Sequence, residues 1–440
     1  MQEILAWSAL GVLQIAVTLS GSHAARAVET EPGPDAPLAA YFELAQRQSP
    51  AVEAARLRWE VALERVPQAA GWPDPTLRYG YFTDEVETAL GPQEHRIGLA
   101  QRFPFFGKLG LRVDSAEQAA LSAWHRYREK RLAVFEHVAH AYYAYAYLAR
   151  AIEVTHENLT LLEGVENVVR TRYATGRAPQ SDLLRVQVEV GTLEDRLRSF
   201  EEMREPWAKR LNAALGRDVD VPLPWPVPLL DPPDALPDNA TVLEHVRSNS
   251  PELLALRFET READRSLALT RRDQFPDITL GIENIRTSRS DLTNFSDSGR
   301  DAWILSVSVP IPVQRSKYRA AIREADARHR GTLVTQRDRE LRLLAETEVL
   351  LFEQRDAERR IELYRKSLIP LGQQAFNAAN TSFATGATSF VDTLDAERVL
   401  LQFQLELARA RADRGRVTTA ILARMGMTPE GVEEPAAVAR

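Results

Sequence analysis

The sequence predicts a mainly α-helical protein with a small β part, built from two copies of one elongated unit. A repeat, long stretches without Gly or Pro, and four short segments of alternating residues support this fold class. The tetrapeptide Tyr-Ala-Thr-Gly at 173–176 returns as Phe-Ala-Thr-Gly at 383–386, and at the same spacing Asp182 matches Asp392. A repeat of this size is longer than solenoid units and indicates that a whole supersecondary unit was duplicated and fused.

Other matches extend the repeat upstream at slightly shorter spacings. They pair Ser49-Pro50 with Ser250-Pro251, the segment 72–77 with 275–280, and Phe103-Pro104 with Val309-Pro310. We therefore expect repeat 1 at residues 41–221 and repeat 2 at residues 241–427. Seven prolines between positions 222 and 237 exclude a helix there and predict an extended linker at 222–240. Residues 428–440 are expected to form a C-terminal tail.

The same elements are expected in each repeat, in the same order. A first helix at 38–70 and at 240–274 is ended by prolines. Two strands come next, because apolar residues alternate with polar or small ones. A very long helix and a returning helix complete each repeat. The strands are expected at 76–83, 96–103, 278–285 and 303–309, the long helices at 111–163 and 316–369, and the returning helices at 180–215 and 390–425.

The long helix of repeat 1 carries apolar residues at alternating spacings of four and three, which predicts a coiled-coil seam. Its positions include Val134, Val138, Ala141, Tyr145 and Leu148. Four strands with one apolar face cannot close a barrel within one chain, and an open sheet would leave its edges unpaired. Such strands suit an outer membrane if several chains close one barrel. The sequence thus predicts an oligomer with helical rods attached to a shared barrel.

The N-terminus predicts export. Residues 4–19 form an apolar run, and Ala25-Arg26-Ala27 fits a cleavage site for a signal peptide at 1–27, followed by a leader at 28–40. The first three residues carry no positive charge, which departs from the usual signal, and an N-terminal anchor or buried helix is the alternative. No later stretch is long and apolar enough to predict a transmembrane helix.

Composition narrows the function. The net charge is −7 without a dominant basic face, which argues against nucleic acid as a partner. These 440 residues contain no cysteine, which excludes disulfides, zinc–thiolate sites, thiol catalysis and a lipid-modified N-terminal Cys. No phosphate-binding loop, zinc-protease motif or hydrolase elbow occurs. We therefore expect no enzyme activity, no catalytic residue, no metal site and no cofactor.

With this order of elements the chain resembles the TolC-type outer-membrane efflux protein family. The resemblance depends on the duplicated order and on local matches at Ser49-Pro50, Pro73-Asp74-Pro75, 173–176 and 386–397. It implies a TolC-like homotrimer, with four strands per chain in a shared 12-stranded transmembrane β-barrel. A long periplasmic α-helical coiled-coil barrel continues it. The resemblance also implies a periplasmic adaptor (membrane fusion) protein and an inner-membrane pump as partners. Segment 101–108 is similar to the branch that serves heavy-metal efflux.

The resemblance further implies a periplasmic gate made of aspartate rings, just after the Gly of the second tip turn. The matching residues are Asp392 and Asp395, three apart on one helical face. Crowded carboxylates at a constriction favour cations. The alternative for Asp392 is a capping box with Ser389 at the start of a helix. Asp182, at the tip of repeat 1, is expected to be a cap or a surface charge.

Gly176 and Gly386 are expected to form the tip turns that dock the adaptor, a role that coexists with an ordinary helix C-cap. The family locks its closed tip with a Tyr and an Arg, and the matching residues here are Phe383 and Thr388, which cannot form that charged link. Three arginines near the tip are expected to be solvated charges, with a substitute lock as the alternative: Arg170, Arg172 and Arg185. His137 and His140, beside a tyrosine cluster, are expected to be surface or interface residues rather than metal ligands.

The function predicted is an outer-membrane exit duct of a tripartite efflux system, a passive conduit for small solutes gated at its periplasmic tip. Heavy-metal cations are one candidate cargo. The alternative is a soluble periplasmic coiled-coil adaptor or scaffold, which has no need of the outward apolar residues at 303–309. A secreted enzyme on a helical scaffold is a third possibility, but the sequence offers it no catalytic set.

Overall fold

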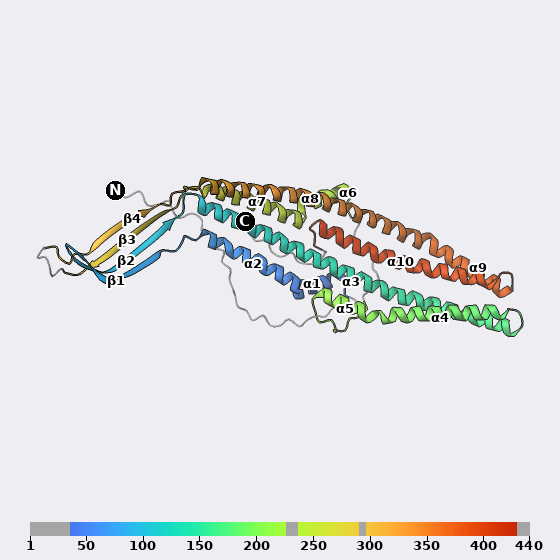
Figure 1. The fold of residues 1–440 in the computed structure, drawn as a ribbon. Coiled ribbons are helices and arrows are strands. Elements are labelled where there is room, and N and C mark those ends of the chain that lie inside the picture. The colour runs from blue at the N-terminus through green and yellow to red at the C-terminus, as the bar shows by residue number, and fades with distance from the viewer. Residues whose placement is uncertain (1–35, 226–235, 290–295, 429–440) are drawn as a thin grey trace, which may run out of the picture.

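The computed structural model describes residues 36–225, 236–289 and 296–428. These residues form an elongated molecule with a small sheet at one end and long helices running away from it (Figure 1). The signal peptide expected at 1–27, most of the leader, the middle of the linker and nearly all of the tail lie outside the described residues. Within them the predicted mainly α-helical class with a small β part is confirmed.

The first helix of each repeat is broken in two, so the single helices expected at 38–70 and 240–274 are wrong. The pairs are α1 (Leu38–Gln48) with α2 (Pro50–Ala70), and α6 (Asn239–Asn249) with α7 (Pro251–Arg272). The breaks fall at Ser49 and Ser250, whose ψ angles are 116° and 122°. A proline ring clashes with a helical residue before it and moves that residue to extended backbone. The repeated Ser-Pro therefore marks a bend.

The C-terminal ends of two other helices pack closely against these bends. They are α5 (Arg204–Leu215) and α10 (Phe390–Arg424). Gly216 comes directly after α5 and Gly426 comes two residues after the end of α10, with φ angles of 79° and 77°. A Cβ on Gly216 would lie 2.6 Å from the Ser49 Cα, and one on Gly426 would lie 2.6 Å from the carbonyl oxygen of Asn249. Both turns thus need glycine, because the φ angle is positive and because the neighbouring backbone leaves no room for a Cβ atom.

The four strands form one antiparallel sheet in the order β1-β2-β3-β4. They are β1 (Thr76–Thr88), β2 (Gly91–Phe103), β3 (Ile278–Thr287) and β4 (Ala302–Ser308). β1 and β2 are longer than expected, because residues 86–88 also pair with residues 91–93, after a shift in register between Tyr81 and Val86. One face carries exposed apolar side chains, with Leu77 72% and Leu305 81% exposed. In the described chain, β1 and β4 each have a neighbour on one side only.

The long helices run from the sheet to the opposite end of the molecule (Figure 1). Helix α3 (Lys108–Ala174) has 67 residues, and α8 (Arg315–Leu363) continues through a π-helical turn, η1 (Tyr364–Leu368), into α9 (Ile369–Thr385). The returning helix of repeat 1 is split at Met203 into α4 (Gln180–Glu202) and α5, whereas α10 is continuous. The seam predicted on α3 is buried, with Val138 and Tyr145 fully covered.

Candidate functional site at the helical tips

Two helical hairpins, α3–α4 and α9–α10, end at the tip furthest from the sheet (Figure 1). In both turns the glycine has positive φ, 69° at Gly176 and 83° at Gly386. The Gly176 N–H donates to the Tyr173 carbonyl at 2.9 Å, and the Gly386 N–H donates to the Phe383 carbonyl at 2.9 Å. In each turn the next residue bonds five residues back, which completes a Schellman motif. The two tips therefore share one backbone design.

Asp392 caps the helix that leaves the second tip. The Ser389 N–H donates to Asp392 Oδ2 at 3.3 Å, and the Ser389 hydroxyl donates to the same oxygen at 3.2 Å. This is a capping box at the start of α10. The carboxylate is nevertheless exposed. A capping role thus leaves Asp392 at the surface of the tip, where a second role remains open to it.

Asp395 lies one turn further along α10 and is also exposed, at 65% of its side chain. Its Oδ1 is 3.9 Å from Nη1 of Arg398, whose Nε donates to Glu189 of α4 at 2.9 Å. The structure therefore places Asp392 and Asp395 together on the solvent side of α10. Asp182 lies in the first turn of α4 and is half-buried. The residue before α4 is Pro179, which has no N–H to give, so a reciprocal capping box cannot form there.

Arg172 connects the two tips, so the expectation that it is a solvated charge is wrong. Its Nη1 donates to the carbonyl oxygen of Phe383 across the two hairpins. Its guanidinium lies 4.7 Å from the centroid of the Phe383 ring, a cation–π contact. Arg170 pairs with Glu166 in its own helix, and Arg185 is exposed. Phe383 thus takes part in the link between the hairpins through its carbonyl oxygen and its ring. Comparing the Phe side chain with the Tyr of the family does not reveal this link.

The sequence reasoning missed Glu397, two turns from the start of α10. This side chain is 1% exposed, and its Oε1 has no hydrogen-bond partner among the described residues. The pKa of Glu397 is raised to about 7, mainly by burial and also by the negative charge of Glu189, while the positive charge of Arg398 opposes the shift. Glu397 lies between Leu394 and Leu401, both buried, at spacings of three and four. A carboxylate at a core position of the heptad was the signal for it.

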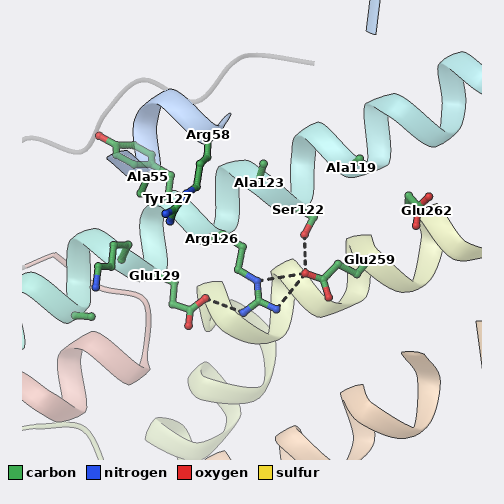
Figure 2. Close-up of a pocket in the computed structure, with 12 residues that line it drawn as sticks. Ala55, Arg58, Ala119, Ser122, Ala123, Arg126, Tyr127, Glu129, Glu259 and Glu262 are labelled. Carbon is green, nitrogen blue, oxygen red and sulfur yellow. Dashed lines mark hydrogen bonds and ion pairs between the residues drawn. The ribbon is translucent and has the colours of Figure 1, made fainter. Parts of the chain in front are cut away.

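A cavity of about 650 Å³ lies far from the tip, between α2, α3 and α7 (Figure 2). Arg126 crosses it and donates to Glu129 at 3.0 Å and to Glu259 at 3.1 Å. The Ser122 hydroxyl donates to Glu259 at 3.3 Å. Arg126 and Ser122 thus tie α3 to α7 across the cavity.

Among the described residues, no three His, Asp or Glu side chains are grouped as metal ligands. His137 and His140 are both exposed on α3. None of the helices in the part of the chain that the structure describes is long and apolar enough to cross a membrane.

The duplicated strand pairs, the paired hairpins and the tip turns define the class of outer-membrane efflux channels. The profile of the outer membrane efflux protein family matches residues 42–217 and 242–426. The chain belongs to this family, which confirms the resemblance drawn from the sequence.

Several known proteins are similar to the chain. It is 23% identical to the probable outer membrane lipoprotein SilC of Salmonella typhimurium, over 80% of this chain and 76% of that one. It is 27% identical to the cobalt-zinc-cadmium resistance protein CzcC of Cupriavidus metallidurans, over 39% of this chain and 40% of that one, so this match spans less than half of the relative. The solved structure of VceC from Vibrio cholerae superposes with a TM-score of 0.73 at 19% identity, over 89% of this chain and 97% of that one.

Proposed function

We propose that this protein is the passive exit duct of a tripartite efflux system, gated at its periplasmic tip. In this proposal three copies close one outer-membrane barrel. A periplasmic adaptor binds the helical tip and holds it open, and an inner-membrane pump supplies the energy. The observation that carries the gate is the exposed pair Asp392 and Asp395 on α10, beside the tip turn of Gly386. Carboxylates gathered from several copies would favour cations at a constriction.

The exposed apolar face of the sheet favours a duct over the soluble adaptor. Leu305 and Val307 are 81% and 66% exposed, and a soluble protein gains nothing by presenting them to water. In an outer membrane such a face meets lipid. A soluble adaptor would leave this apolar face of the sheet in contact with water.

Heavy-metal cations are the cargo we propose. The support is the names of two relatives, the cobalt-zinc-cadmium resistance protein CzcC and the cation efflux system protein CusC of Escherichia coli, which is 22% identical over 82% of this chain. Deleting the gene in its host should then raise sensitivity to divalent or monovalent heavy metals more than to an organic dye. Equal sensitivity to both would contradict a metal cargo.

The gate is tested by single-channel recording of the purified protein in planar bilayers. Asp392→Asn and Asp395→Asn together should lower the preference for cations over anions and weaken block by multivalent cations, because the rings lose their charge. The matched control is Asp182→Asn, which removes a carboxylate at the same place in repeat 1 and should leave both quantities unchanged. If the double variant conducts like the unaltered protein, Asp392 and Asp395 are not the gate.

A further inference from the structure

The two faces of the sheet carry different side chains. One face is apolar, and its Leu77 and Leu305 are exposed. The other face is mainly small or polar, and its residues include Gly80, Gly98, Ala100, Thr279, Gly281, Ser306 and Ser308. Side chains of a strand point alternately to opposite faces, so this division follows directly from the sequence. When a barrel closes in a membrane, its apolar face meets lipid and its polar face lines the lumen.

Three arginines stand on this polar face, Arg78 on β1 and Arg96 and Arg102 on β2. Between the helices and the register shifts of the described sheet, Glu283 on β3 is the one acidic residue in the strands. It lies on the same face, and its Oε2 accepts a hydrogen bond from Nη2 of Arg96 at 2.8 Å. Three positive charges and one negative charge therefore leave two uncompensated arginines on this face, Arg78 and Arg102.

Arg78 and Arg102 are exposed, and neither guanidinium has a hydrogen bond or ion pair within the described residues. In the register of the sheet, Arg78 lies opposite Gly98. Arg102 lies opposite Thr279. The row between them holds only small residues, which are Thr76, Ala100, Gly281 and Ser306. The sheet extends beyond the helices (Figure 1), so the two arginines keep their charge and their N–H donors available to a solute.

These two arginines stand at two levels of the sheet. Gly98, which lies opposite Arg78, is separated from Arg102 along β2 by roughly 13 Å, at about 3.3 Å per residue. A guanidinium stays protonated in proteins, so both levels are permanently positive. Electrostatic screening acts over about 8 Å at physiological ionic strength, so the fields of the two levels overlap in the space between them. Three copies around one lumen would set three such arginines at each level.

The charge at this end of the molecule is opposite in sign to the charge at the tip. Asp392 and Asp395 are exposed on α10, whereas the polar face of the sheet exposes Arg78 and Arg102. A region of fixed positive charge concentrates anions and repels cations. A solute with several phosphate or carboxylate groups can pair with more than one guanidinium, and such charge-assisted hydrogen bonds are strong. Multivalent anions should therefore be held more firmly than chloride.

We propose that Arg78 and Arg102 form an arginine belt, a binding site for multivalent anions in the lumen of the barrel. The inference rests on the proposed duct and adds a second selective region, of the opposite sign, at its other end. A metal cation that leaves through the tip then crosses the belt most readily when it is bound to anionic ligands. The belt thus favours cargo that carries negative groups.

The test is block of the full-length channel in planar bilayers by inositol hexakisphosphate, added to the chamber that the barrel faces. The recordings use about 0.1 M potassium chloride, where screening acts over about 10 Å. Arg78→Gln and Arg102→Gln together should raise the half-blocking concentration about tenfold or more, because charge-assisted hydrogen bonds to the anion are lost. The matched control is Arg286→Gln, which removes an exposed arginine from the apolar face of β3 and should leave the half-blocking concentration unchanged.

The reversal potential in a gradient of potassium chloride gives a second readout. Asp392→Asn with Asp395→Asn removes the charge of the tip, so the belt should then shift the reversal potential towards anion preference. Adding Arg78→Gln and Arg102→Gln to that variant should reverse the shift, whereas adding Arg286→Gln should not.

The outcomes separate the belt from the duct. Channels of the double arginine variant that are blocked like those of the unaltered protein overturn the belt and leave the proposed duct standing. An equal loss of block in Arg286→Gln overturns the belt as well, because that arginine is on the other face of the sheet. A protein that opens no channel in the bilayer overturns the duct and the belt together.

Discussion

The two tips share a turn and differ in how the next helix begins. Gly176 and Gly386 close the same hydrogen-bonded motif, but α10 begins with a capping box at Ser389, and α4 begins after Pro179 without one. At the repeat spacing, the carboxylates of α10 have different counterparts on α4: Asp392 matches Asp182, Asp395 matches Arg185, and Glu397 matches Gln187. Duplication therefore kept the backbone in both tips, and the carboxylates were concentrated in one.

The largest expected effect comes from Glu397, the buried carboxyl that only the second tip has. Its pKa of about 7 lies above the ordinary value of 4.5, so the folded tip holds an extra proton between these values. The free energy of unfolding of the tip should fall as pH rises from 4.5 to 7, by up to about 3 kcal/mol at 1.36 kcal/mol per unit. Glu397→Gln should remove this dependence and stabilise the tip at pH 7.5.

Amide hydrogen exchange of the α9–α10 peptides, corrected for intrinsic rates, measures this local free energy. The matched control is Glu194→Gln on α4, an exposed glutamate whose loss should leave the pH dependence as it was. A Glu397→Gln variant with the same pH dependence as the unaltered chain would show that the buried carboxyl is not the titrating group.

The difference between the tips also shows what the sequence could predict. The strands, the long helices and the tip glycines were predictable, because alternation, the absence of Gly and Pro, and the repeated Ala-Thr-Gly are local signals. The prolines after Ser49 and Ser250 were used only as matches between the repeats, so the bends that they impose were not predicted. Glu397 was missed, and a link from Arg172 was kept only as the alternative to a solvated charge, because both depend on which helices meet, a property of tertiary packing.

A smaller effect is expected from the tip glycines. Alanine in left-handed backbone costs roughly 1–2 kcal/mol, so Gly176→Ala and Gly386→Ala should each destabilise their own hairpin. A Cβ on Gly176 would meet open space, whereas one on Gly386 would lie 3.2 Å from Nη2 of Arg172. Hydrogen exchange of the two hairpins should therefore show a larger loss for Gly386→Ala. Equal losses would indicate that the link from Arg172 adds nothing at this position.

The smallest effect concerns the cap itself. Ser389→Ala removes the hydroxyl from the capping box of α10 and should cost about 1 kcal/mol, seen as faster exchange in the first turn of that helix. Ser181→Ala is the control, because Ser181 is exposed inside the first turn of α4, which has no capping box. Since the cap also fixes Asp392, the Ser389→Ala channel should show noisier cation block with little change in its mean conductance. If both variants exchange alike, the box at Ser389 does not stabilise the second tip, and the contrast between the tips reduces to their charges.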